Sequence, residues 1–387
     1  MQPCNYETMK PLSVLTYYTR NKLKLAPVFA VLALAVFGIS LTGVLTGTIR
    51  DSALQRIEVY RSAVQVSPSF LNGRNTIDAS LKADLQYNPS VEALVPDIRL
   101  STYLPTLSGQ MGAHIYAVNV EVYPLLMKRF DLELIEGRLP RAGAPEVALH
   151  EVLARARGLN IGDVLDPEKD NQEWLRGRLE IVGLLRGPTV LSLASLEYVE
   201  RRSEFRGYAR SLLAIPQLEA QAVLENDLRG VPKEEARVYT YSSELQIFAQ
   251  DFASMDAIVW AINSVVVLVL SLLVGLLNMI YFLDRMNEFG LLLGIGYARG
   301  FLIRRALIES LLLTVLAWAF GIVFAQVAYG LLNQFIFEPR GMSLSVLNWR
   351  ALQFTLPIPI MVGLFTAGTV IWQLRKLDPI SIIERRD

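Results

Sequence analysis

The chain has 387 residues, of which 52% are apolar and 19% are charged, and 37 Lys and Arg balance 37 Asp and Glu. This composition excludes an intrinsically disordered chain, which needs low hydrophobicity, and a basic nucleic-acid-binding protein, which needs a cationic excess. One cysteine and two histidines exclude a disulfide framework and a zinc module built from these residues. An apolar soluble enzyme and a membrane protein both fit.

Four long apolar runs predict four transmembrane helices, over 25–48, 257–283, 306–332 and 351–374, with Glu309 as the one charged residue inside them. At 1.5 Å per residue, 24 residues reach about 36 Å, which exceeds the roughly 30 Å of a hydrocarbon core. The first run is longer than a signal-sequence core of about 7–15 residues and has no A-x-A cleavage site after it. We therefore expect an uncleaved first helix.

Lysine and arginine concentrate before the first run, between the second and third, and after the fourth, which places these segments in the cytoplasm by the positive-inside rule. The loop between the third and fourth runs has only Arg340 and Arg350. The chain is thus predicted to be a multi-pass protein of the cytoplasmic (inner) membrane. Its predicted segments outside the four helices are a cytoplasmic N-terminal segment 1–24, an extracytoplasmic domain 49–256 with helical stalks, a cytoplasmic loop 284–305, a short outer loop 333–350 and a cytoplasmic tail 375–387.

The segment between the first two runs has an ordinary globular composition, and its patterns predict a mixed α/β domain of one or two lobes. Alternating apolar positions predict strands over 57–66, 91–100 and 179–185. The stretch 146–159 is amphipathic and ends at a turn with Gly158, which predicts a short helix.

Apolar residues at spacings of three and four mark both edges of this domain. A helix over 244–283 would have 40 residues and a length of about 60 Å. Two interpretations are open from periodicity alone: a packing stripe, or a pair of stalks that carry motion from the membrane to the domain. The stalk candidates are Ile49, Ala53, Ile57 and Tyr60 on one side and Leu245, Phe248, Phe252, Met255 and Val259 on the other.

Motifs of catalysis are missing from the sequence. There is no G-x-x-x-x-G-K-[ST] loop and no Gly-Lys dipeptide, so the chain is not expected to hydrolyse ATP itself. There is no G-x-S-x-G elbow and no H-E-x-x-H motif, and His114 and His150 lack ligand spacing. We predict no catalytic residue, metal or cofactor in this chain.

Two features near the third run suggest other roles. Glu309 follows Arg305 by four residues, which predicts an ion pair at the membrane interface, with a proton or substrate role as the alternative. The segment 284–305, DRMNEFGLLLGIGYARGFLIRR, is amphipathic, and its four glycines predict a sharp turn. It is either a membrane-surface helix or a knob that docks into a partner's groove.

At these residues the sequence resembles the MacB/FtsX-like permease family of ABC transporters. NMIYFLDRMNEFGLLLGIGYARGFLIRRALIESLLL is similar to that family's stretch between helices 2 and 3, although the family usually has an Ala-Leu-Gly-Ala-Ser-like turn where this chain has Gly294–Arg299. The matching positions are Asn278, Arg285, Glu288, Phe289, Gly290, Gly296, Ile303, Glu309 and Ser310. The stretch YPLLMKRFDLELIEGRLPRAGAPEVALHEVLARARGLNIGDVLD is similar to the family's periplasmic core domain, and the ending LRKLDPISIIERR also resembles the family's.

The resemblance implies a permease that pairs with a second copy or a paralogue, and a separate cytoplasmic ATPase subunit that binds ATP and Mg. It implies a coupling helix at about 288–299 that sits on this ATPase, and it favours mechanical stalks over a packing stripe. A periplasmic adaptor is a further partner in some relatives. The implied coupling residues are Arg285, Glu288, Phe289, Gly290, Gly294, Gly296, Tyr297 and Arg299.

The function expected from the resemblance is ATP-driven export or extrusion of a peptide, lipid or lipoprotein-like substrate. One alternative is a regulator that passes force to an extracytoplasmic enzyme such as a cell-wall hydrolase, and another is an outward-facing receptor without an ATPase. The charges agree with the topology. Residues 50–256 have 23 Lys and Arg against 29 Asp and Glu, whereas the rest has 14 against 8.

Overall fold

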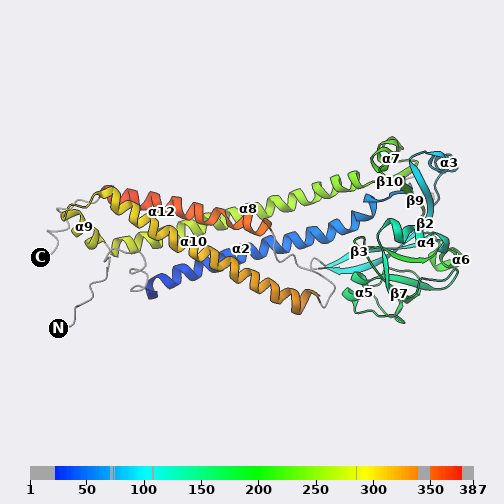
Figure 1. The fold of residues 1–387 in the computed structure, drawn as a ribbon, viewed down its shortest axis with the longest axis horizontal. Coiled ribbons are helices and arrows are strands. Elements are labelled where there is room, and N and C mark those ends of the chain that lie inside the picture. Colours follow the sequence, from blue (N-terminus) through cyan, green and yellow to red (C-terminus); the bar gives the residue numbers. More distant parts are fainter. Residues whose placement is uncertain are drawn as a thin grey trace, which may run out of the picture. The chain divides into compact units, whose positions relative to one another are not determined.

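The structure, a computed structural model, describes residues 22–69, 73, 75–106, 109–284, 286–338 and 349–376 (Figure 1). Its internal contacts divide the chain into two units. The helical unit comprises 1–47, 255–331 and 345–387, and the sheet unit comprises 48–254 and 332–344. Each is described by itself.

Long helices dominate the helical unit, and by length and composition four described helices are able to cross a membrane. These stretches are Ala26–Arg61, Tyr241–Tyr281, Gly300–Phe335 and Leu352–Trp372. This confirms the predicted fold class of four apolar helices with a mixed α/β domain between the first two. The helices of this region are α2 (Lys22–Ile57), α8 (Tyr241–Asp284), α9 (Met286–Gly294), α10 (Arg299–Leu332), the π-helical η5 (Asn333–Phe337), α11 (Trp349–Thr355) and α12 (Pro357–Lys376).

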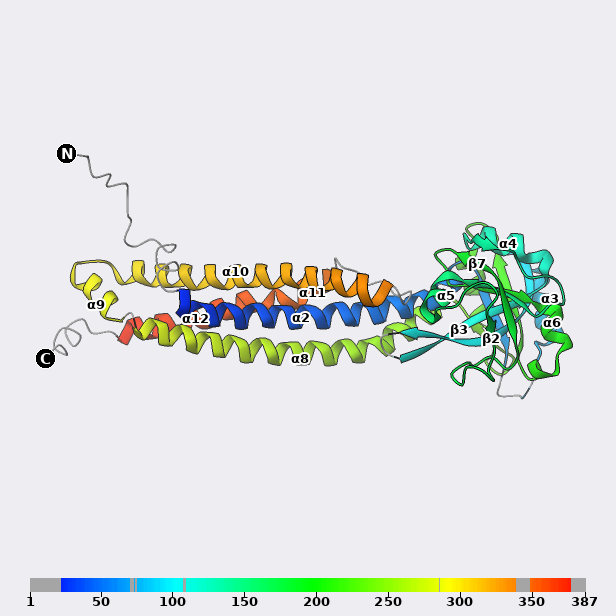
Figure 2. The same ribbon diagram turned by 90° about the horizontal axis from the view of Figure 1, so that it is seen from below.

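The helical unit has a continuous apolar core to which α2, α8, α10, α11 and α12 all contribute. Figure 2 shows the course of these helices. Two glycines let helices approach closely. A Cβ on Gly321 of α10 would lie 2.8 Å from the carbonyl oxygen of Ala33 on α2, and a Cβ on Gly275 of α8 would lie 2.3 Å from the ring of Phe365 on α12. Small residues at such crossings are typical of helices that pack in lipid, where close van der Waals contact replaces the hydrophobic effect.

The sheet unit contains one mixed sheet with the described order β10-β1-β9-β2-β3-β8-β5-β7-β4, and β6 also pairs with β7. Its strands are β1 (Val64–Pro68), β2 (Val91–Thr106), β3 (Gly109–Val118), β4 (Glu133–Gly137), β5 (Glu146–His150), β6 (Val164–Leu165), β7 (Leu179–Arg186), β8 (Ser192–Ser195), β9 (Arg210–Pro216) and β10 (Ala236–Tyr239). Its short helices are η1 (Glu58–Arg61), α3 (Ala79–Tyr87), η3 (Val120–Val122), α4 (Tyr123–Arg129), α5 (Glu151–Arg157), α6 (Leu196–Arg201), η4 (Ser203–Phe205) and α7 (Gln221–Leu228).

One long strand holds this sheet together. The first half of β2 pairs with β9 and its second half pairs with β3, with Ile98 common to both registers. Separate apolar clusters lie along the sheet: one around α5 and α6, one around α4 and η1, and one under α3 and α7. The two-lobe alternative is therefore replaced by one sheet with several cores.

Strand predictions were confirmed where alternation is clear and wrong where it is not. The strands predicted over 91–100 and 179–185 lie within β2 and β7. The strand predicted over 57–66 is wrong for its first half, because α2 and η1 continue to Arg61 and β1 begins only at Val64. Ile57, Val59 and Tyr60 are buried as one face of this helical stretch, so their spacing fits a helix as well.

The helix predicted over 146–159 is half wrong. Residues 146–150 form β5, all of which is buried, and the helix α5 begins only at Glu151. A strand that is buried on both faces has no alternation to distinguish it from a helix. The predicted end is confirmed, since Gly158 closes α5 in the left-handed conformation at φ 65°.

Candidate functional site

The predicted coupling segment forms a short helix, a turn and the start of a long helix. α9 ends at Gly294, and α10 begins at Arg299. Gly296 has φ 105° and donates its N–H to the carbonyl oxygen of Leu293 at 3.0 Å, while the N–H of Tyr297 donates to Leu292 at 3.0 Å. The single helix expected over 288–299 is therefore wrong at its second half, because a left-handed glycine terminates a helix.

Phe289 anchors α9 against the long helices. Its side chain is 1% exposed and packs with Leu302 of α10 and Val370 of α12. Gly290 is buried beside it. These two predicted coupling residues thus lie on the inner face of α9.

The outer face of the same segment is apolar and exposed. Leu291 and Ile295 are 62% and 69% exposed, Tyr297 is 39% exposed, and its ring lies 5.6 Å from that of Phe301. We call these four residues the α9 surface. Among the other predicted coupling residues, Glu288, Gly294 and Gly296 are exposed, Arg285 lies outside the described residues, and Arg299 begins α10.

Glu309 forms the predicted ion pair. Its side chain is 8% exposed, and its Oε1 lies 3.2 Å from Nε of Arg305. One residue on, the hydroxyl of Ser310 donates to Thr366 of α12 at 3.5 Å. The ion pair thus lies within α10, and the Ser310–Thr366 contact joins α10 to α12.

The predicted stalk residues lie towards the ends of α2 and α8, within the sheet unit except for Met255 and Val259, which belong to the helical unit. Phe248 is buried, stacks on Phe252 with ring centroids 4.4 Å apart, and has the guanidinium of Arg50 at 5.6 Å. Ile49 and Ala53 line a cavity of about 140 Å³ together with Phe252. Leu245 is 38% exposed, Met255 is half-buried, and Ile57 belongs to the core beneath η1.

Both of these helices continue into neighbouring strands of the sheet. α2 leads through η1 into β1, and β10 leads directly into α8. β1 and β10 pair with each other, with Gln65 opposite Tyr239. β10 is an edge strand, and among the described strands its backbone pairs with β1.

Cations and tyrosines bind the two helix ends to the sheet, and we call this group the stalk junction. Tyr60 stacks on Tyr239 at 6.0 Å, and the guanidinium of Arg99 lies 5.0 Å from the Tyr239 ring and donates to the Tyr60 hydroxyl at 3.3 Å. Arg61 donates to the hydroxyl of Tyr241, the first residue of α8, at 2.9 Å. Of this group, only Tyr60 could be predicted from the sequence, because the residues come from four separate elements, η1, β2, β10 and α8.

A buried carboxyl lies beneath this junction. Asp97 is 1% exposed, and its Oδ1 accepts a hydrogen bond from Nε2 of Gln65 on β1 at 2.8 Å. Burial raises the pKa of Asp97 to about 6, although the nearby Arg99 opposes the shift. Burial and the charges of Arg99 and Arg56 lower the pKa of His114 to about 4.

We predict that Asp97→Asn stabilises the sheet unit at pH 8 but not at pH 4. The folded pKa of Asp97 exceeds its unfolded value of 3.8, so wild type loses stability as the pH rises through about 4 to 6, by on the order of 2–3 kcal/mol. His114 acts in the opposite direction in both proteins, so it cancels in the comparison. Hydrogen exchange of β1 and β2 peptides in the purified full chain measures the difference. A stability difference that does not change between pH 4 and pH 8 would contradict the prediction.

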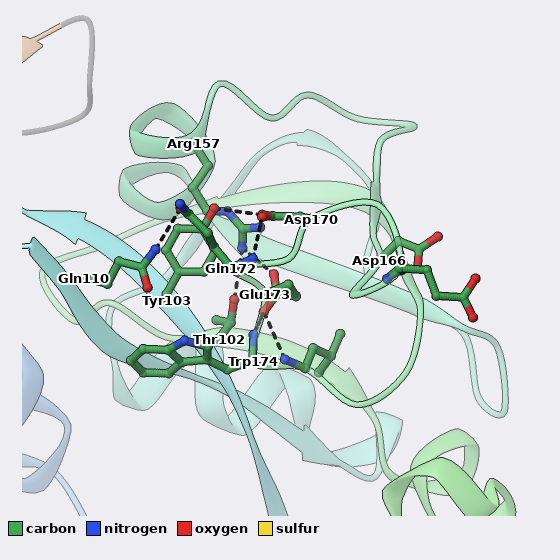
Figure 3. A network of polar contacts seen from close by, with 11 residues as sticks. Thr102, Tyr103, Gln110, Arg157, Asp166, Asp170, Gln172, Glu173 and Trp174 are labelled. Carbon is green, nitrogen blue, oxygen red and sulfur yellow. Dashed lines mark hydrogen bonds and ion pairs between the residues drawn. The ribbon is translucent and has the colours of Figure 1, made fainter.

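A second polar network, centred on Arg157, lies in the sheet unit (Figure 3). The Arg157 side chain is 5% exposed and pairs with Glu173, which is fully buried, at 2.6 Å, and with Asp170 at 3.0 Å. Its guanidinium lies 4.2 Å from the ring of Tyr103, whose hydroxyl donates to Asp170 at 2.8 Å. The network fastens the loop before β7 to β2. Within the described residues, no group of three or more His, Cys, Asp or Glu side chains is placed to hold a metal ion.

The family follows from a comparison of the C-terminal region. Residues 260–379 match the model of the FtsX-like permease C-terminal family, and this range contains most of α8 together with α9, α10 and α12. This C-terminal region therefore resembles that of FtsX-like permeases. No curated protein matches the chain.

Solved structures similar to this chain include outer domains of transporters. The periplasmic region of MacB from Actinobacillus actinomycetemcomitans is 14% identical and covers 51% of this chain and 97% of its own, with a TM-score of 0.30. The extracellular domain of the ABC-type transporter YknZ from Gram-positive bacteria is 13% identical and covers 46% of this chain and 100% of its own, with a TM-score of 0.28.

Proposed function

We propose that this permease is the membrane subunit of an ATP-driven complex that exports or extrudes a peptide, lipid or lipoprotein-like substrate, with ATP and Mg bound by a separate subunit. The observation that carries the proposal is that α9 has one buried face and one exposed apolar face. Its inner face is anchored by Phe289, while Leu291 on its outer face and Ile295 directly after its end are exposed. An apolar surface of this kind on a fixed helix is suited to a groove on a partner protein.

The proposed topology places this surface on the side of the ATPase. Both termini and residues 284–305 lie in the cytoplasm, and residues 50–256 lie outside, in accordance with the positive-inside rule. The excess of six acidic residues in 50–256 and of six basic residues elsewhere supports this orientation.

The stalk junction supports a mechanical role for α2 and α8. Each helix is continuous from the apolar region into the sheet unit, and the two enter paired strands. A change in the spacing of the two helices would therefore act directly on the β1–β10 ladder. We propose that the permease works as a dimer with an identical or paralogous copy, and that an adaptor is a further extracytoplasmic partner.

The charge reversal Glu288→Lys tests the proposal. Glu288 is exposed on α9, so the variant is expected to insert into the membrane normally. It should reduce transport-coupled ATP hydrolysis by about tenfold or more, because a like charge or an unpaired charge at an interface costs several kcal/mol. Hydrolysis is measured in liposomes with the cognate ATPase. The matched control is Glu338→Lys, which makes the same charge change on an exposed residue outside α9.

Normal transport by Glu288→Lys would contradict the assignment of α9 as the coupling element. A permease that never retains an ATPase on purification would instead support a receptor. Retention of an extracytoplasmic hydrolase, with no substrate moved, would support the regulator.

A further inference from the structure

The helical unit contains a groove between α8 and the corner of α11 and α12. It has a volume of about 280 Å³ and is lined mainly by apolar side chains, among them Val267, Leu268, Phe354 and Met361. The ring of Trp260 closes one side by an edge contact with Phe354 at 4.9 Å. All of these residues belong to the helical unit.

Pro357 separates α11 from α12 at this groove. The N–H of Leu356 still makes the helical bond to the carbonyl oxygen of Leu352 at 2.9 Å, but Pro357 has no N–H to continue the pattern and instead starts α12. A helix interrupted in this way changes direction at the proline. Pro357 itself lines the groove, opposite residues of α8.

One polar side chain in this groove lacks a partner. Asn263 is 4% exposed, it lines the groove, and its Nδ2 has no hydrogen-bond partner among the described residues. The neighbouring Ser264 is different, because its hydroxyl already donates to the carbonyl oxygen of Trp260 at 2.7 Å. A buried amide donor without an acceptor is costly, so its presence points to an acceptor supplied by a ligand.

The depth and chemistry of the groove define this acceptor. Asn263 lies six residues inside the start of the apolar run at Ala257, about 9 Å along α8. Trp260, 48% exposed, lies between them at a position where tryptophans mark the membrane interface. None of the lining side chains that the structure describes is charged, so the groove offers no charge compensation for an ion, and most of its walls are hydrocarbon. A carbonyl joined to a hydrocarbon chain satisfies both the amide and the apolar walls.

We propose that this groove binds the acyl ester of a lipid, with the chain against Val267 and Phe354 and the ester carbonyl oxygen accepting a hydrogen bond from Nδ2 of Asn263. The ester comes either from a membrane glycerolipid or from an acylated substrate, since both present the same chemistry. The site goes beyond the proposed function and does not depend on ATP coupling.

The test uses the full chain in lipid nanodiscs without an ATPase or nucleotide. The probes are a phospholipid with a photoreactive diazirine on an ester-linked acyl chain and its ether-linked analogue, which lacks the carbonyl. Mass spectrometry quantifies the labelling of α8 and of α11–α12. In wild type the ester probe should label these peptides about fivefold more than the ether probe, the gain expected from one hydrogen bond.

Variants of the lining residues distinguish the contribution of the hydrogen bond to labelling from that of the groove's shape. Asn263→Leu should bring the ester-to-ether ratio to about one, whereas Ser264→Ala, the matched control, should keep the wild-type ratio. Val267→Phe fills the groove and should reduce labelling by both probes. Displacement of the ester probe by unlabelled phospholipid or by a diacylated lipopeptide supports the site, and the stronger competitor identifies the source.

Several results would overturn the proposal. These are equal labelling of wild type by the two probes, an unchanged ratio in Asn263→Leu, or no displacement by either competitor. Efficient disulfide crosslinking between two copies at Leu268→Cys, in a Cys4→Ser background, would also overturn it, because a second copy would then cover the groove. The Glu288→Lys experiment does not depend on any of these results.

Discussion

Replacing Phe289 with alanine should uncouple the permease from its ATPase without preventing membrane insertion. Phe289 is 1% exposed and joins α9 to α10 and α12, and its truncation is expected to cost about 3–5 kcal/mol of local packing. α9 has only nine residues, too few to stay helical without tertiary contacts. The outer α9 surface would then lose its fixed position, and transport-coupled hydrolysis should fall by more than tenfold. Liposomes that contain the permease and its ATPase provide the measurement.

Phe289→Leu is the matched control for this experiment. A leucine keeps most of the apolar volume, so it should cost under about 1.5 kcal/mol and retain most of the activity. If Phe289→Ala transported normally while hydrogen exchange showed α9 released, the position of α9 would not matter for coupling.

Replacing Arg157 with alanine should have the largest effect on the stability of the sheet unit. The substitution leaves the fully buried Glu173 and its neighbour Asp170 without their cation, and breaking a buried pair in this way costs about 3–5 kcal/mol. For a domain of this size, the loss corresponds to a fall in unfolding temperature of about 10 °C. Thermal unfolding of the purified full chain, followed by proteolysis of the sheet unit, measures it.

Arg155 provides a control on the same short helix. It pairs with Glu151 at 2.8 Å, but its side chain is 60% exposed, so Arg155→Ala should cost under about 1 kcal/mol. Equal destabilisation by the two variants would mean that the Arg157 network does not hold the loop before β7.

The position of the coupling segment in the chain could be predicted from the sequence, but the way it folds could not. Its glycines predicted a turn, and Gly296 has a positive φ just after the end of α9. Periodicity could not tell that Phe289 faces inward, because both faces of this short segment are apolar. That distinction depends on Leu302 and Val370, which are distant in the sequence.

The sequence by itself determined the four apolar helices, the α/β segment between the first two, and the absence of nucleotide-binding motifs. Run length and local charge are properties of consecutive residues, so they need no tertiary information. Only the tertiary structure decided that α2 and α8 enter paired strands, that Arg157 and Glu173 share a buried site, and that Asn263 faces an open groove. These features depend on contacts between distant segments, and one sequence has no signal for such contacts.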